Sequence, residues 1–170
     1  MEHGGGPVRT SRAVPAVDVP TRAGEPPHFT GSFHHAVDGK HRLVLPAPFR
    51  SRLADGAYLG PLVGYLGLWP QDGFGAVLSR WKDGVELGIV SEQQFRAFRG
   101  KTYWVQPDGQ GRIVVHQDLR DFAGVAGPVV IVGDDESIEV WAAARWENDQ
   151  ADLPEGRDAA LRQAARDLRL

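Results

Sequence analysis

Two segments of the chain place an arginine four residues after an aspartate: Asp38 with Arg42, and Asp108 with Arg112. An aspartate that opens a turn accepts hydrogen bonds from backbone N–H groups two residues further on, which stiffens the turn. The arginine then has a fixed base, and its guanidinium can bind a phosphate or pair with the O6 and N7 atoms of guanine. The other interpretation of this spacing is an ion pair that only closes the turn.

The two Asp–Arg segments belong to a longer internal repeat. Residues 38–45 (DGKHRLVL) and 108–115 (DGQGRIVV) share Asp, Gly, Arg and Val at an offset of 108 − 38 = 70 residues. In the same register, Phe49–Arg50 aligns with Leu119–Arg120. A match of this length and order is typical of a duplicated unit. Because the duplication preserves the Asp-x-x-x-Arg pattern, it favours a functional role for the arginines.

Each repeat predicts the same succession of secondary-structure elements. A strand leads into a turn at Asp-Gly, a dipeptide that favours hairpins, and a second strand follows over residues 43–45 or 113–115. A short helix closed by a glycine is expected next, near residues 47–53 or 117–123. A strand that leads to a tryptophan and a second helix complete the unit. We therefore expect a mostly β chain with short helices, in the α+β class.

Four segments are expected along the chain. Residues 1–27 are rich in proline and glycine without apolar periodicity, which predicts a disordered extension. The first repeat is expected over residues 28–84 and the second over residues 85–150, where Ser91 opens a capping box that predicts a helix start. Residues 151–170 carry apolar side chains at helical spacing, which predicts a helical tail that packs on the core, joins an oligomer contact or frays.

The total charge argues against an anionic ligand, but its distribution favours one. The chain has 19 lysines and arginines against 22 aspartates and glutamates, a formal net charge of −3, whereas nucleic-acid binders usually show a basic footprint. From residue 34 to residue 52, however, Asp38 is the only acidic residue among Lys40, Arg42, Arg50 and Arg52. The net charge therefore hides a local basic patch.

The basic patch supplies secondary candidates for ligand contacts. Lys40, Arg50 and Arg52 are expected to contact phosphates, which positions a nucleic acid without selecting its sequence. Arg120 is the second-repeat counterpart of Arg50. The alternative for these side chains is a solvated helix face or a bridge between units or chains. His41, inside the first Asp-x-x-x-Arg segment, is a further candidate contact.

No catalytic or metal-binding constellation is recognisable in the sequence. The absence of cysteine excludes disulfides and thiolate zinc sites. His34 and His35 would point to opposite faces of a strand, so only one of them could join His41 at a metal. There is no recognisable nucleophile–base pair and no Walker-type phosphate loop. We expect no enzyme activity, no metal, no cofactor and no small-molecule substrate.

The composition is that of an ordinary globular protein, with 42% hydrophobic and 24% charged residues. The longest uncharged apolar stretch, residues 57–69, is too short to span a bilayer. The N-terminus lacks the apolar core of a signal peptide. We expect a soluble, cytoplasmic protein without a membrane partner.

The residues around both Asp–Arg segments resemble the MraZ family. In the first half the resemblance is carried by residues 29–33 (FTGSF), residues 38–42, Pro46 and Arg50. In the second half it is carried by residues 95–100 (FRAFRG), residues 108–112, Gly133 and residues 138–141 (IEVW). The likeness is collinear over roughly residues 29–150, which makes it more specific than one short motif.

The resemblance implies both a fold and a function. MraZ proteins resemble the SpoVT/AbrB swapped-hairpin group, in which two tandem units form one double-split β-barrel and chains assemble into rings. It implies a homo-oligomeric, nucleoid-associated transcriptional regulator that binds double-stranded DNA at short G-rich repeats upstream of its own division and cell-wall gene cluster. Carried over by position, the DNA-facing residues are Asp38, Arg42, Asp108 and Arg112.

The sequence departs from the family pattern at two positions. His41 stands where the family has a glycine, which the second repeat keeps as Gly111, and His116 stands where the family has a proline. The second repeat also carries Asp118 and Asp121, which make it less basic than the first. We therefore expect unequal halves, with the first contributing more to DNA affinity.

A protein-interaction module remains the alternative. Such a module would be antitoxin-like or scaffold-like and would keep the fold without specific DNA binding, since fold does not dictate function. The salt dependence of DNA binding separates the two classes, because a DNA binder loses affinity steeply as salt rises.

Overall fold

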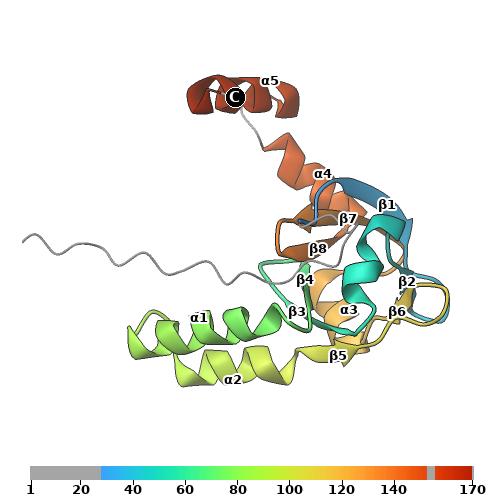
Figure 1. Cartoon of the computed structure of the whole chain (residues 1–170), viewed down its shortest axis with the longest axis vertical. Helices are drawn as coiled ribbons and strands as arrows, with labels where there is room; N and C mark the ends of the chain where they lie inside the picture. The colour runs from blue at the N-terminus through green and yellow to red at the C-terminus, as the bar shows by residue number, and fades with distance from the viewer. Residues whose placement is uncertain (1–27, 153–155, 170) are drawn as a thin grey trace, which may run out of the picture.

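The computed structural model describes residues 28–152 and 156–169, so the extension expected over residues 1–27 lies outside the described residues. The chain has a mixed α/β fold whose strand pairings are all antiparallel in this part of the chain (Figure 1). The strands are β1 (Ser32–Ala36), β2 (Arg42–Val44), β3 (Ala57–Pro61), β4 (Leu66–Pro70), β5 (Tyr103–Val105), β6 (Arg112–Val114), β7 (Pro128–Asp134) and β8 (Ser137–Ala142). The helices are α1 (Phe74–Glu86), α2 (Glu92–Gly100), α3 (Gln117–Ala123), α4 (Ala143–Ala151) and α5 (Arg157–Leu168), with 3-10 turns η1 (Ala47–Phe49) and η2 (Ser51–Leu53).

Six of the strands form one sheet in the order β1-β7-β8-β4-β3-β5. The outer strands β1 and β5 do not pair with each other in the described residues, so this sheet is open and the closed barrel implied by the resemblance is not found. The remaining strands, β2 and β6, pair with each other in a two-stranded sheet. We call this two-stranded sheet the ribbon.

The sheet exchanges strands between the two halves of the chain. Strand β1 of the first half lies on β7 of the second half, with Ser32 opposite Val132. In the same way, β5 of the second half lies on β3 of the first, with Leu59 opposite Tyr103. The ribbon also takes one strand from each half. Each half therefore needs the other to complete its sheet.

The turns at Asp-Gly form as expected, but the strands that flank the first one do not pair as a simple hairpin. Strands β1 and β2 share only an isolated bridge between Val37 and Leu43. The reason is that β1 is paired along its length with β7, and β2 is paired with β6. The turn was predicted correctly from the sequence, and the partners of its strands were predicted wrongly.

The two short helices expected after the ribbon strands differ. The second is α3, which covers residues 117–123 as expected and ends at Gly124 in the left-handed region, with φ 66°. The first, expected near residues 47–53, forms as the two successive 3-10 turns η1 and η2 rather than as one α-helix. Ala47 precedes Pro48, and the proline ring makes the α region unfavourable for the residue before it. A 3-10 turn is the shorter alternative.

The main core lies between the ribbon and the larger sheet. Leu43 and Leu45 in and after β2, and Ile113 and Val115 in and after β6, are each at most 1% exposed. Burying one such aliphatic side chain stabilises the fold by about 1.5–3 kcal/mol. The inward faces of both ribbon strands are therefore fixed, and with them the direction of the outward faces.

Helices α1 and α2 form a helical hairpin that projects from the sheet (Figure 1). Helix α2 begins at the expected capping box, in which Gln94 N donates to Ser91 Oγ over 3.1 Å and Ser91 N donates to Gln94 Oε1 over 2.8 Å. A second buried cluster, made of Trp69, Phe74, Phe95 and Phe98, attaches the hairpin to β4. This hairpin raises the share of helix above what a mostly β chain would have.

The tail helix α5 forms as expected, but its apolar stripe is largely exposed. It has no buried residue, and Leu161 and Leu168 are 59% and 70% exposed. In Figure 1 it stands beyond α4, apart from the sheet. None of the described helices combines the length and the apolar character needed to cross a membrane.

Candidate nucleic-acid interface

The first Asp–Arg loop, residues 38–42, is organised around one carboxylate. Asp38 Oδ1 accepts hydrogen bonds from the backbone N–H groups of Lys40 and Arg42 over 2.8 and 2.9 Å. Its Oδ2 accepts from Arg42 Nε over 2.8 Å and pairs with Arg42 Nη2 at 2.8 Å. The aspartate thus holds both the backbone of the turn and the guanidinium that leaves it, as expected from the spacing.

The second Asp–Arg loop, residues 108–112, repeats this geometry. Asp108 Oδ1 accepts from the backbone N–H groups of Gln110 and Arg112, each over 3.0 Å. Asp108 Oδ2 accepts from Arg112 Nε over 2.8 Å and pairs with Arg112 Nη2 at 2.7 Å. The internal repeat seen in the sequence is therefore a repeat of atomic contacts.

Each aspartate is held in its charged form. Hydrogen bonds from the backbone N–H and the side chain of Arg42 lower the pKa of Asp38 to about 2. The pKa of Asp108 is lowered in the same way, first by the backbone N–H of Arg112 and also by its side chain. Both carboxylates are therefore charged at neutral pH and stay paired with their arginines.

The ion pairs leave part of each guanidinium for a ligand. A guanidinium carries five N–H donors in a planar fork, and the aspartate uses Nε and one side of Nη2. No further partner of Nη1 is recorded for Arg42 or Arg112 among residues 28–152 and 156–169. The end of the fork, formed by Nη1 and Nη2, can therefore donate to a phosphate or to two acceptors on one base edge.

The ribbon brings the two loops together. Strand β2 follows the first loop and β6 follows the second, and they pair with Arg42 opposite Val114 and Val44 opposite Arg112. The contact continues past the strand ends, where Leu45 N donates to Gly111 O over 2.8 Å and Val115 N to His41 O over 2.9 Å. Both arginines therefore belong to one small surface, although they are seventy residues apart in the chain.

The secondary candidates lie around this surface in different settings. Lys40 and His41 are exposed at the tip of the first loop. Arg50 and Arg120 are half-buried and donate to backbone carbonyls, Arg50 Nε to Leu45 O over 2.9 Å and Arg120 Nη1 to Val115 O over 2.6 Å. The guanidinium of Arg52 lies 4.2 Å from the centre of the Phe29 ring. The three arginines thus have structural contacts, and a role for them at DNA stays a prediction.

The histidines of the basic patch differ in their exposure. His34 is exposed and the neighbouring His35 is half-buried on β1, where burial and the charge of Arg50 lower the pKa of His35. In the described part of the chain, no group of three or more His, Asp or Glu side chains is placed to hold a metal ion.

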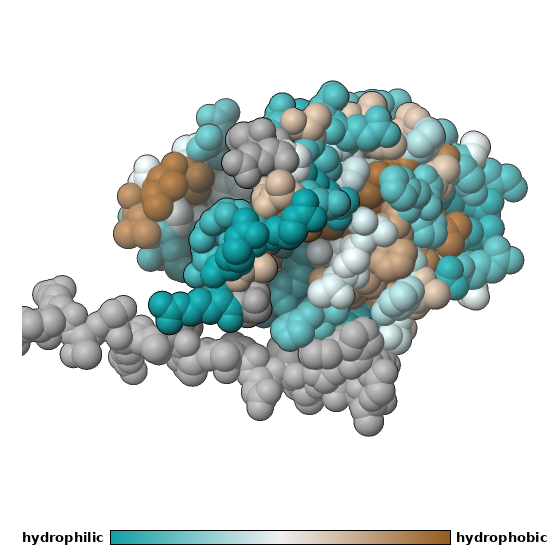
Figure 2. All heavy atoms as spheres, turned by 90° about the horizontal axis from the view of Figure 1, so that it is seen from above, coloured by the Kyte–Doolittle hydropathy of each residue, from teal (hydrophilic) through white to brown (hydrophobic). Residues whose placement is uncertain are grey.

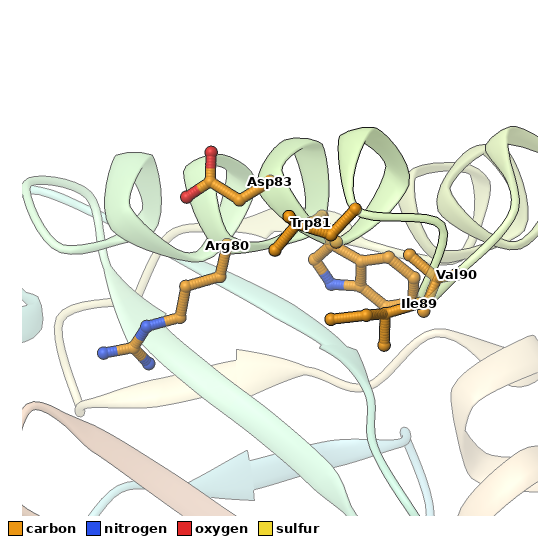
Figure 3. A pocket seen from close by; sticks show the side chains of 7 residues that line it. Arg80, Trp81, Asp83, Ile89 and Val90 are labelled. Atoms are coloured by element: carbon orange, nitrogen blue, oxygen red, sulfur yellow. The ribbon is translucent and has the colours of Figure 1, made fainter.

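A hollow of the described surface lies elsewhere, at the end of the α1–α2 hairpin. It measures about 370 Å³ and is lined by Arg80, Trp81, Asp83, Gly84, Leu87, Ile89 and Val90. In Figure 3, Trp81 and Ile89 lie close together while Asp83 points away from them. This lining is mainly apolar and presents no nucleophile with an adjacent base.

Sequence reasoning missed one contact that supports the site. An added Cβ on Gly111 would lie 2.5 Å from Arg50 Nε and 2.7 Å from Arg50 Cδ, so this glycine makes room for an arginine of the other half. A sign of this contact was present in the alignment of the two repeats, in which Arg50 recurs as Arg120 and the glycine before the arginine occurs only in the second loop, as Gly111. What the alignment does not contain is the pairing of β2 with β6, which brings Gly111 and Arg50 together.

The structure thus combines an open antiparallel sheet with a two-stranded ribbon that carries two Asp–Arg loops. The profile of the family described as "MraZ protein, putative antitoxin-like" matches residues 98–167. Relatives include the transcriptional regulator MraZ of Bifidobacterium longum, 35% identical over 136 residues that cover 79% of this chain and 90% of the relative. Those of Mycolicibacterium smegmatis (30% identical, covering 82% of this chain and 99% of the relative) and Symbiobacterium thermophilum (36%, covering 68% and 85%) are also similar. The chain belongs to the MraZ family.

Proposed function

We propose that this chain is a transcriptional regulator that binds double-stranded DNA in a sequence-specific manner through Arg42 and Arg112. In this proposal each guanidinium pairs with the O6 and N7 atoms of a guanine, and Asp38 and Asp108 hold the guanidinium in place. Lys40, Arg50, Arg52 and Arg120 contact phosphates, and His41 approaches the DNA from the tip of the first loop.

The observation that carries the proposal is the position of two Asp–Arg loops, with the same contacts around their aspartates, on one two-stranded ribbon. The major groove of B-DNA admits a two-stranded β-ribbon. A guanidinium already fixed by two bonds to a carboxylate loses little conformational freedom on binding, and guanine offers it two acceptors. The names of the relatives, transcriptional regulators, agree with this role.

The fold of the proposed regulator is a pair of tandem SpoVT/AbrB-like units, over residues 28–84 and 85–150, that exchange strands. The pairing of β1 with β7 and of β5 with β3 supports this division, because it relates the two halves by the same exchange. A ring of several chains would place many Asp–Arg loops on one DNA, which suits repeated G-rich sites. The sites proposed are those upstream of its own division and cell-wall gene cluster, which places the protein in the cytoplasm at the nucleoid.

The proposal is tested by titrating the full chain against labelled duplex from upstream of its own gene and against scrambled duplex. At two salt concentrations, we expect a preference for the upstream duplex and an affinity that falls with salt at a slope of about 0.9 per phosphate contacted. Arg42→Ala and Arg112→Ala should each weaken specific binding by about 1–3 kcal/mol. Arg42→Ala should weaken binding more than Arg112→Ala does. The first loop, with Lys40, is the more basic one and is expected to contribute more to DNA affinity.

The matched control is Arg99→Ala. Arg99 also forms an ion pair, with Glu92 at 2.9 Å, but it lies on α2 and outside the ribbon. It should leave DNA affinity unchanged. Equal binding to upstream and scrambled duplex, with both loop variants behaving like the unmodified chain, contradicts the proposal.

A second candidate is the interaction module. It is favoured by the end of the α1–α2 hairpin, where hydrophobic side chains gather on the surface in Figure 2 and Leu87 and Ile89 are each 74% exposed. Exposed apolar patches of this kind mark contacts with other proteins. A chain that shows no specific DNA binding but forms a complex that Leu87→Asp abolishes would favour this candidate.

A further inference from the structure

The outward face of the ribbon carries two valines beside the two arginines. Side chains alternate along a strand, and Leu43 and Ile113 point inward with exposures of 0% and 1%. Their neighbours on each strand therefore point outward. These outward residues are Arg42, Val44, Arg112 and Val114.

Val114 is unusual among the valines of the strands. It is 59% exposed although it lies in a paired strand, whereas the other valines of the described strands are buried or half-buried. Val44, its counterpart in β2, is half-buried. Exposing a valine costs the free energy that its burial would supply, about 1.5–3 kcal/mol. An apolar contact made only in a complex would recover that free energy.

The register places each valine beside an arginine of the other strand. Val114 lies opposite Arg42 and Val44 lies opposite Arg112, and directly opposed side chains have Cβ atoms about 4.5–5.5 Å apart. Each guanidinium is also drawn back onto its own aspartate, and the side chain of Arg42 is only 28% exposed. The short valine and the folded arginine therefore present a polar and an apolar group side by side to one ligand.

In the major groove of DNA, the apolar group that base edges display is the C5-methyl group of thymine. We infer that Val114 is a specificity-determining residue that packs on a thymine methyl group next to the guanine bound by Arg42, with Val44 as a weaker counterpart beside Arg112. This inference rests on the proposed DNA-binding function. It adds thymine, through an apolar contact, to a recognition otherwise made only of arginine hydrogen bonds.

The test removes single methyl groups from the DNA. Duplexes that bind the full chain are selected from a random pool, and each thymine of a selected duplex is replaced in turn by deoxyuridine, which lacks only the C5-methyl group. Losing one buried methyl group corresponds to about a fourfold loss of affinity. We expect this loss at one thymine for each Arg42 contact, and a smaller loss at a thymine beside the Arg112 contact.

The variant Val114→Ala completes the cycle. It should bind the thymine duplex about fourfold more weakly than the unmodified chain does, and replacement of the sensitive thymine should have no further effect on it. Val63→Ala is the control, because Val63 is 89% exposed in the turn between β3 and β4 and lies outside the ribbon. It should keep the full response to deoxyuridine. An unchanged urea midpoint confirms that Val114→Ala folds.

The outcomes separate this inference from the proposed function. If binding requires Arg42 and Arg112 but no deoxyuridine substitution changes the affinity, or if Val114→Ala stays sensitive to the same thymine, the valine contact is wrong and the DNA-binding function stands. If no duplex is enriched from the pool, both the inference and the proposed function fail.

Discussion

The two Asp–Arg loops make the same contacts around their aspartates and differ in the residue before the arginine. In the second loop this residue is Gly111, buried, with φ 72°, and Arg50 lies against it. In the first loop it is His41, exposed, with φ 63°. Arg120, the counterpart of Arg50, reaches its carbonyl through a terminal nitrogen rather than through Nε. The comparison shows that the same Asp–Arg geometry forms with two different residues before the arginine. One is a glycine packed against Arg50, and the other is a histidine in a strained backbone conformation.

The largest expected effect on stability is at Gly111, which is packed against Arg50. Gly111→Ala places a Cβ in a left-handed backbone, which costs about 1–2 kcal/mol, and displaces Arg50 from its bond to Leu45 O, which costs about 1 kcal/mol more. We expect the free energy of unfolding, measured with urea, to fall by about 2–3 kcal/mol. Gly124→Ala is the control, since Gly124 is also in the left-handed region, with φ 66°, and a Cβ there meets nothing within 4 Å. Equal losses for the two variants would show that Arg50 is not seated by Gly111.

The strained backbone of His41 predicts a gain in stability when this residue is replaced by glycine. His41→Gly relieves the left-handed strain of a residue with φ 63°, and the greater freedom of glycine in the unfolded chain offsets part of this. The net gain in the free energy of unfolding should be no more than about 1 kcal/mol. DNA affinity, measured on the same variant, reports whether the imidazole touches the ligand: a loss of affinity despite the gain in stability supports a direct contact. A loss of stability would contradict the interpretation of His41 as strained.

The difference in charge between the loops predicts a smaller effect. Lys40 at the tip of the first loop corresponds to Gln110 in the second. Lys40→Gln should reduce the slope of log affinity against log salt by about 0.9, the value for one phosphate contact, without changing the preferred sequence. The reverse variant, Gln110→Lys, should increase the slope by a similar amount if the second loop also lies beside a phosphate. A changed sequence preference would instead indicate that Lys40 reads a base.

The smallest effect is the pH dependence of the first loop. The pKa of Asp38 is lowered to about 2 in the folded chain, below about 3.9 in an unfolded one. The stability that this carboxylate contributes is therefore present above pH ~4 and is lost as pH falls through ~2. Asp38→Asn should lower the urea midpoint at pH 7. Near pH 2, the difference in urea midpoint between the variant and the unmodified chain should become smaller. A constant difference across this range would show that the charge of Asp38 does not stabilise the loop.

The sequence predicted the parts of the site that depend on local contacts. The bonds of Asp38 and Asp108 lie within five residues, as do the capping box at Ser91 and the end of α3 at Gly124, so local pattern was sufficient. The pairing of β2 with β6 was not predictable in this way, because it joins residues seventy positions apart. The seat of Arg50 on Gly111 and the exposed face of Val114 depend on that pairing and were missed with it.

Strand exchange also fixes when this chain can fold during its synthesis. The first strand of the sheet, β1, pairs with residues 128–132, so no fragment released from the ribosome before that point contains its partner. Contacts between residues this far apart slow folding, because a long loop must close before they form. Until then β1 has exposed edges that can pair with another nascent chain. The nascent polypeptide should therefore depend on chaperones until almost all of its described strands have emerged.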